Sequence, residues 1–145
     1  MRAARTDDEI QAALRLRFKV FCKGQGVALE AERDGRDQEA VHLVAVEGPR
    51  VIGTCRLLVD DDVARLGRMA VEAAHRGRGV GAALLAEAER AMRGAGADRI
   101  RLHAQTAARG VYDRAGYRVL GEEFVEEGIE HVAMEMPLAG EAPVA

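Results

Sequence analysis

The spacing of apolar residues along the chain changes several times, and each change marks a predicted helix or strand. Apolar positions at three- and four-residue spacing indicate helices, whereas alternating or short continuous apolar runs indicate strands. Thr6 or Asp7 can cap the first helix, because oxygen acceptors and negative charge stabilise its free first-turn amides. In chain order we predict a strand at residues 1–5, a helix to about residue 22, a loop at 23–39, strands at 40–47, 50–59 and 63–71, a helix from 79 to about 94, a strand at 98–105, a helix at 106–115, and strands at 117–120 and 130–138.

The order of these elements predicts the fold class. Three consecutive strands joined by turns at Gly48-Pro49 and at residues 60–62 indicate an antiparallel meander. The later strands alternate with helices, so we predict an α/β domain (α+β type) around a mixed, mainly antiparallel sheet. The 145 residues contain no repeat or linker, and we expect one domain over residues 1–138 with a frayed tail at 139–145.

Composition disfavours several classes of function. Hydrophobic residues make up 48% and aromatic residues only 3% of the chain, which is typical of a soluble domain that does not bind nucleic acid by base stacking. No stretch approaches the roughly 20 apolar residues of a membrane span, and the N-terminus has no signal-peptide core. Cys22 and Cys55 form no disulfide framework, and the four histidines show no metal-ligand spacing. We therefore expect a cytoplasmic protein without a metal, a membrane partner or a nucleic-acid partner.

Charge is distributed unevenly along the chain. The net charge is −3, but residues 65–118 hold eleven arginines against five acidic residues, and residues 119–145 hold seven glutamates with no lysine or arginine. One interpretation is ordinary surface charge. The other is a basic centre that suits a polyanionic ligand, beside an acidic segment that attracts a cation.

A glycine-rich segment, Arg76-Gly77-Arg78-Gly79-Val80-Gly81, joins a predicted strand to a predicted helix. Glycines let a phosphate approach the free amides at a helix start, and two arginines add positive charge, which indicates a pyrophosphate site. A nucleotide-binding P-loop is excluded, since it needs Gly-Lys-Ser/Thr. A dinucleotide fingerprint, Gly77-x-Gly79-x-x-Ala82, is disfavoured because Gln105 stands where an acidic residue is needed. A structural helix cap remains an alternative.

The sequence resembles a known family in two signatures. The glycine-rich segment is similar to the acyl-CoA-binding signature of the GNAT superfamily of N-acyltransferases, and a later segment resembles its second signature. The matching residues are Arg76, Gly79 and Gly81, followed by Val111, Tyr112, Gly116 and Tyr117. Short segments also resemble the ElaA-like branch, namely Val20-Phe21, Asp34-Gly35 with Asp37, His42, Gly67-Arg68, Ala104-Gln105 and residues 126–134. Gly24-Gln25 stands where that branch commonly has Glu-Gln, so a glutamate role is not carried over.

The resemblance implies a fold and a cofactor site. It implies helices on both faces of the sheet, and a strand at 63–71 that splays from the strand at 98–105 so that the pantetheine of acetyl-CoA lies in the gap. The residues that it assigns to the cofactor are Met69, Ala70, Val71, Arg76, Gly77, Arg78, Gly79, Val80, Gly81, Ala82, Gln105 and Tyr112. It implies direct attack of an amine on the thioester, with the Val71 amide stabilising the oxyanion. Tyr112 would protonate the departing thiolate, although a purely structural hydroxyl is the alternative.

The acceptor amine has to lose its proton before it attacks. A lysine-like amine has a pKa near ~10.4, so its neutral form costs about 4.6 kcal/mol at pH 7. His103 lies on the polar face of its predicted strand and is the candidate base, with His131 and His42 as rivals. Cys55 lies mid-strand and is expected to be an inert thiol rather than a nucleophile. Acidic residues that could bind a cationic acceptor, or form a solvated loop, are Glu30, Glu32, Asp34, Asp37, Glu126, Glu127 and Glu130.

We therefore predict an acetyl-CoA-dependent N-acetyltransferase that acts on a small-molecule or peptide amine, with a cationic amine as one possibility. A monomer or a homodimer is expected. The alternative from another class is a CoA-binding sensor or interaction module without turnover. Tyr112 favours the enzyme, because a protein that only binds CoA has no use for a proton donor at the sulfur.

Overall fold

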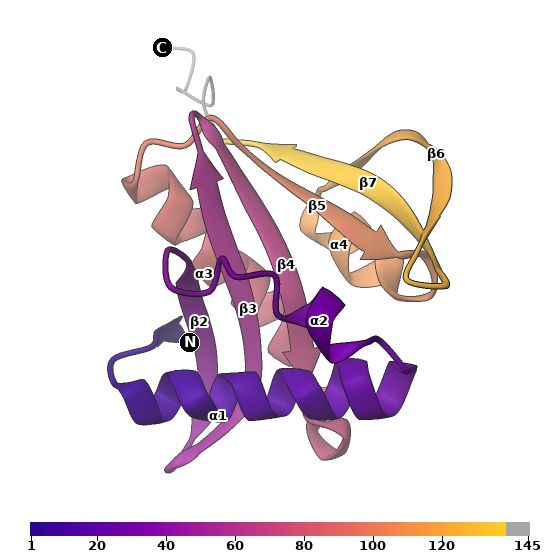
Figure 1. Ribbon diagram of the computed structural model, residues 1–145. Helices are drawn as coiled ribbons and strands as arrows, with labels where there is room; N and C mark the ends of the chain where they lie inside the picture. The colour runs from indigo at the N-terminus through magenta and orange to yellow at the C-terminus, as the bar shows by residue number, and fades with distance from the viewer. Residues whose placement is uncertain (139–145) are drawn as a thin grey trace.

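The computed structural model describes residues 1–138, and the expected frayed tail at 139–145 lies outside the described residues (Figure 1). Its strands are β1 (Arg2–Ala3), β2 (Val41–Glu47), β3 (Arg50–Asp60), β4 (Val63–Val71), β5 (Arg99–Gln105), β6 (Arg118–Glu126) and β7 (Ile129–Pro137). Its helices are α1 (Asp7–Arg17), α2 (Leu29–Glu32), α3 (Val80–Gly94) and α4 (Arg109–Ala115), with a π-helical turn at Phe18–Lys23 and 3₁₀ turns at Ala73–His75 and Thr106–Ala108. Thr6 caps α1 as predicted, since its hydroxyl accepts a hydrogen bond from the Glu9 amide at 3.1 Å.

The strands form a seven-stranded sheet in the order β1-β2-β3-β4-β5-β7-β6. All neighbours in this sheet run antiparallel except β4 and β5, which run parallel, so the mixed, mainly antiparallel sheet is confirmed. The helix α1 crosses one face of the sheet with α2 beside it, and α3 covers the other face with α4 next to it (Figure 1). Helices on both faces are therefore confirmed as well.

The strands β4 and β5 separate partway along their length. Their parallel pairing begins with Val63 beside Arg99 and ends with Leu66 beside Leu102. Past that point β4 stays paired only with β3, and β5 stays paired only with β7 (Figure 1). The expected splay is confirmed, and it leaves facing backbone edges that no neighbouring strand covers.

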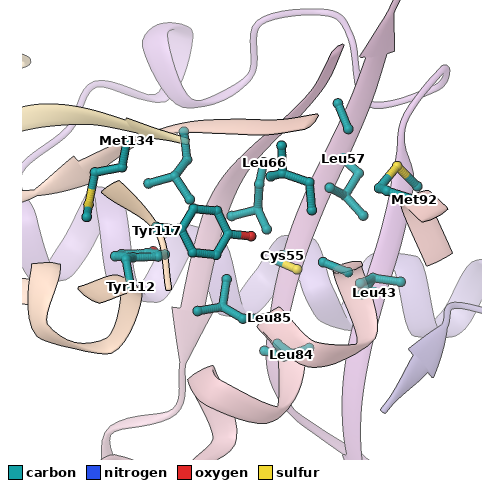
Figure 2. Close-up of a cluster of buried hydrophobic side chains, with 14 of the residues drawn as sticks. Leu43, Cys55, Leu57, Leu66, Leu84, Leu85, Met92, Tyr112, Tyr117 and Met134 are labelled. Atoms are coloured by element: carbon teal, nitrogen blue, oxygen red, sulfur yellow. The ribbon is translucent and has the colours of Figure 1, made fainter. Parts of the chain in front are cut away.

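The apolar core lies between the sheet and α3 (Figure 2). Leu84 and Leu85 of α3 are completely buried and belong to the same apolar cluster as sheet residues such as Leu57. A Cβ on Gly53 of β3 would lie 2.7 Å from the Val80 side chain, so this close approach of helix to sheet requires glycine. The packing fixes the first turn of α3 beside the place where the strands separate.

Two predicted boundaries are wrong. Residues 23–39 were expected to form a loop, but they contain the short helix α2, whose Glu32 is held by a buried ion pair to Arg17. The strand predicted at 117–120 continues as β6 to Glu126, past a register shift at Gly121 with φ of 76°. Most of β6 is exposed, so its sequence lacks the alternation that reveals a half-buried strand.

Candidate active site

A cleft of about 1360 Å³ opens where β4 and β5 separate. Strands β4 and β5, the loop before α3, helix α4 and the β6–β7 hairpin all contribute to its walls. His103 lines it, and so does every residue that the resemblance assigns to the cofactor except Arg78. Those residues are Met69, Ala70, Val71, Arg76, Gly77, Gly79, Val80, Gly81, Ala82, Gln105 and Tyr112.

The glycine-rich loop presents open backbone at one end of this cleft. Gly77 and Gly79 have φ of 76° and 79°, which side chains rarely adopt, and a Cβ on either would meet no atom within 4 Å. Gly79 caps α3 without a side-chain hydrogen bond, so no side chain occupies the first-turn amides. The Arg76 Nε donates to the Val71 carbonyl at 3.1 Å, which ties the loop to the end of β4. These amides and the helix dipole suit a bound phosphate group.

The strand β4 turns its backbone toward the cleft after a bulge. Thr54 of β3 pairs with Ala70 and Arg56 pairs with Gly67, so Arg68 and Met69 together lie opposite Cys55 alone. Just beyond β4, the Glu72 amide donates to the Ile52 carbonyl on β3 at 2.8 Å.

Backbone amides along an extended segment point alternately to its two edges. Because the Glu72 amide points to β3, the Val71 amide points to the opposite edge, where β4 has left β5. The Val71 amide is therefore available to an acceptor atom inside the cleft.

Tyr112 reaches the cleft from α4. Its ring packs edge-on against Tyr117, with ring centroids 6.0 Å apart, and the residue is buried (Figure 2). Burial raises the pKa of Tyr112 to about 12, so its hydroxyl keeps its proton at neutral pH. No hydrogen bond to this hydroxyl is present among residues 1–138.

The three candidate histidines lie in different surroundings. His103 is half-exposed in the cleft, and its Nδ1 lies 3.0 Å from the Glu126 carboxylate. His131 also lines the cleft but is buried, and its Nδ1 lies 2.7 Å from the Ile129 carbonyl. Because a carbonyl only accepts, this Nδ1 carries the hydrogen and leaves Nε2 as the basic nitrogen. His42 does not line the cleft, and its Nε2 lies 2.8 Å from the Asp37 carbonyl.

Gln105 makes a contact that the sequence did not indicate. Its side-chain amide exchanges two hydrogen bonds with the amide of Gln25, at 3.0 Å and 2.8 Å. Both residues line the cleft. The resemblance drew attention to Gln25 only as part of a departure from the branch pattern, and a separation of 80 residues offered no local signal for the pairing.

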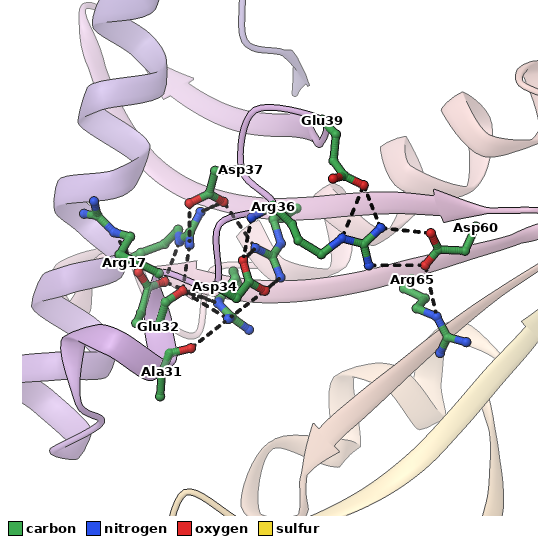
Figure 3. A network of polar contacts seen from close by, with 12 residues as sticks. Arg17, Ala31, Glu32, Asp34, Arg36, Asp37, Glu39, Asp60 and Arg65 are labelled. Carbon is green, nitrogen blue, oxygen red and sulfur yellow. Dashed lines mark hydrogen bonds and ion pairs between the residues drawn. The ribbon is translucent and has the colours of Figure 1, made fainter.

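The acidic residues between α1 and β2 are mostly paired with arginines. Arg17 binds Glu32 at 2.6 Å and Asp37 at 2.8 Å, and Arg56 binds Asp34 at 2.8 Å (Figure 3). Hydrogen bonds from Arg56 hold the pKa of Asp34 well below its usual range. The expectation of a solvated acidic loop, or of free carboxylates for an acceptor, is therefore wrong for these three acids. Of the remaining candidates, Glu126 and Glu127 line the cleft.

The described residues give little support to a cysteine nucleophile or a metal site. Cys55 is buried, and burial raises the pKa of its thiol to about 12, so it is not a ready thiolate. Residues 1–138 contain no cluster of three or more side chains suited to hold a metal ion. None of the helices in this part of the chain is long and apolar enough to cross a membrane.

Comparisons with known proteins agree with this geometry. A family model described as an acetyltransferase (GNAT) domain matches residues 5–138. YjcF of Bacillus subtilis (strain 168), named as an uncharacterized N-acetyltransferase, is 36% identical over 132 residues, covering 90% of this chain and 94% of YjcF. A solved acyl-CoA N-acyltransferase from Pseudomonas aeruginosa is 28% identical with a TM-score of 0.80, covering 90% of this chain and 92% of its own. Escherichia coli ElaA is 26% identical with a TM-score of 0.81, covering 90% and 91%.

Proposed function

Because the chain belongs to the GNAT family of acetyltransferases, we propose that it moves the acetyl group of acetyl-CoA to a primary amine of a small molecule or peptide. The observation that supports this most strongly is the cleft between the separated ends of β4 and β5, with an open helix N-terminus at its end. A long thioester with a phosphate-bearing end fits a cleft of this shape and charge. The amine attacks the thioester carbon directly, so no acyl-enzyme is formed.

The loop residues bind the phosphates of CoA in this proposal. The amides from Gly77 to Ala82 donate to the pyrophosphate, while Arg76 and Arg78 supply positive charge. No carboxylate pairs with either arginine within residues 1–138. Pantetheine lies along Met69, Ala70 and Val71, and Gln105 contacts it from β5, held by its pairing with Gln25.

The reaction forms a C–N bond and breaks the C–S bond. As the amine attacks, the Val71 amide donates to the oxygen of the thioester carbonyl, where negative charge develops. Tyr112 donates to the departing sulfur. Its pKa of about 12 lies above the ~8.5 of a thiol, so complete proton transfer to a free thiolate would be uphill. Tyr112 therefore acts mainly as a hydrogen-bond donor in the transition state, and its effect is modest.

We assign the base to His103. Its Nδ1 faces Glu126, which holds the ring with the hydrogen on Nδ1 and leaves Nε2 to take the proton of the amine. Glu126 and Glu127 give this end of the cleft negative charge, which favours a cationic acceptor. His131 presents the same tautomer and is the rival base.

The expected setting is a reducing one, and we propose the cytoplasm. Both cysteines, Cys22 and Cys55, are free. Disulfides are rare in reducing compartments, so two unpaired thiols in one small domain fit such a setting. We propose that the protein acts there as a monomer or a homodimer.

The test is a panel of primary amines with acetyl-CoA, in which release of free CoA thiol is measured together with acetylated product. We expect transfer to cationic amines, and a fall of about 10²–10⁴-fold in kcat for His103→Gln, with CoA affinity unchanged. A larger fall in His131→Gln would transfer the role of base to His131. Tight CoA binding without transfer to any amine would favour a CoA-binding sensor over an enzyme.

A further inference from the structure

A network of buried charges lies beneath α1 and extends to β4. Arg17 at the end of α1 binds Glu32 of α2, and both side chains are only 1% exposed. Asp37 binds Arg17 and also Arg56 of β3, at 2.8 Å and 3.2 Å, and Arg56 continues the chain of contacts to Asp34 (Figure 3). The network therefore joins α1, α2, the loop after α2 and the sheet.

Arg68 is the member of this network that belongs to β4. Its guanidinium donates to the Glu32 carbonyl at 3.0 Å and to the Ala31 carbonyl at 3.2 Å. Its Nε also lies 3.4 Å from the Glu32 carboxylate. The Arg68 side chain thus binds both backbone carbonyls and a side-chain carboxylate at the C-terminal end of α2.

The backbone of Arg68 has an unusual conformation. It lies in the β4 bulge with φ of 53°, a left-handed conformation that costs free energy for any residue except glycine. Such a conformation persists only where surrounding contacts hold it. The Arg68 side chain supplies such contacts through its bonds to α2 and through Asp34, which lies 3.4 Å from its Nη2.

The bulge lies between two parts of the proposed site. Met69 is part of the bulge, and Ala70 and Val71 follow it directly. We assign all three to the pantetheine arm, with the Val71 amide on the thioester oxygen. The Arg68 side chain binds α2, and α2 comes in the sequence directly after the cleft-lining residues Gln25 and Val27. A change in the bulge would therefore alter both the direction of the Val71 amide and the distance from β4 to the segment before α2.

We infer that Arg68 is a positioning residue, which aims the Val71 amide at the thioester carbonyl and holds α2 against the acetyl-transfer site. This inference rests on the proposed function. Bulges next to active sites commonly change the direction of backbone groups. Here the side chain of the bulged residue fixes the bulge through its hydrogen bonds to α2. The role needs a guanidinium, because its Nε and Nη2 donate together to the Glu32 carbonyl while Nη2 also reaches the Ala31 carbonyl.

The inference is tested with three variants. Arg68→Met removes the hydrogen bonds, and Arg68→Lys keeps the positive charge without the planar guanidinium. Arg68→Gly removes the side chain and also the cost of the left-handed φ. The matched control is Arg36→Met, because Arg36, in the loop after α2, pairs with Glu39 and Asp60 without contacting the bulge (Figure 3). Readouts are kcat, the Kd of CoA, and the infrared carbonyl frequency of a bound, unreactive ketone analogue of acetyl-CoA.

We expect a fall of roughly 10–10²-fold in kcat for Arg68→Met, and smaller falls for Arg68→Lys and for Arg68→Gly, because glycine adopts the left-handed φ without the side-chain contacts. The Kd of CoA stays within about threefold, because the phosphate loop is unchanged. The bound carbonyl loses the shift to low frequency that a hydrogen bond from Val71 causes, and Arg36→Met matches the wild type in all three readouts. A folded Arg68→Met or Arg68→Lys protein with wild-type kcat and carbonyl frequency would overturn the inference.

The carbonyl frequency separates this inference from the proposed function. If the wild-type protein binds the analogue but acetylates no amine, the proposed enzyme activity is wrong. The frequency still reports whether Arg68 positions the Val71 amide. If Arg68→Met does not fold, Arg68→Lys and Arg68→Gly give the same comparison.

Discussion

Two groups of arginines show how this protein uses the same side chain in opposite ways. Under α1, Arg17 and Arg56 are 1% and 6% exposed and are matched by carboxylates of Glu32, Asp34 and Asp37. At the glycine-rich loop, Arg76 and Arg78 have no carboxylate partner among residues 1–138 and stand beside free amides. Charge that is already paired within the protein stabilises its shape, while charge left unpaired beside open backbone is available to a ligand. Variants in the two regions should therefore affect different measurements.

The largest effect on stability is expected from Arg17→Met. Removal of Arg17 leaves the buried Glu32 carboxylate with weaker partners, and breaking a buried pair typically costs about 3–5 kcal/mol. Arg33 and Arg68 still lie near Glu32, so the lower end of that range is expected. Urea unfolding measures the loss. Arg36→Met removes a more exposed ion pair and should leave the urea midpoint nearly unchanged, and equal losses would contradict the distinction.

Within the cleft, Tyr112→Phe is expected to lower the rate, but by less than His103→Gln. The variant keeps the ring packing against Tyr117 and deletes one hydroxyl. We predict a fall in kcat of roughly 10–10³-fold, with the Kd of CoA nearly unchanged. Stopped-flow thiol release under single-turnover conditions checks this. Wild-type kcat where chemistry limits turnover would remove the donor role, and a large loss of folding stability would indicate a structural hydroxyl.

The stability of the protein should depend on pH in opposite directions through the ion pairs under α1 and through the cleft. Asp34 has a lowered pKa in the folded state, so its contribution is present above its unfolded pKa of ~3.9 and is lost as pH falls through the folded value. Tyr112 has a pKa raised to about 12, so its contribution is present below ~10 and is lost as pH rises toward about 12.

Each of these groups contributes a slope of at most about 1.4 kcal/mol per pH unit. Urea midpoints measured across pH should therefore fall at both ends. Asp34→Asn should flatten only the acid limb and Tyr112→Phe only the alkaline limb. If each variant changed both limbs equally, the assignment of these groups to separate regions would be wrong.

The sequence predicted those parts of the fold that depend on local pattern. The bounds of β4 and the start of α3 follow from apolar spacing and from glycines at Gly77 and Gly79, which need only their own segment to be interpreted. The resemblance to the GNAT superfamily and to ElaA is confirmed by the family match and by the solved structures. The splay of β4 from β5 followed from that resemblance and not from any periodicity.

The parts that were missed depend on contacts between distant residues. Helix α2 has only four residues and no side-chain cap, and its Glu32 is buried because Arg17, fifteen residues away, neutralises it. The pairing of Gln25 with Gln105 spans 80 residues. Arg68 has a left-handed φ that its residue type does not suggest. None of these features has a local sequence signal, since each depends on the folded sheet.

The proposed function depends most on the glycine-rich loop binding the pyrophosphate of CoA. Calorimetric titration of CoA against Gly81→Leu tests it most directly, with Gly94→Leu as the control, since both glycines lie in α3 without a left-handed φ and only Gly81 lines the cleft. We predict a rise of about 100-fold or more in Kd for Gly81→Leu, a change within about threefold for Gly94→Leu, and wild-type binding that weakens with salt. Unchanged affinity in a folded Gly81→Leu protein would contradict the claim.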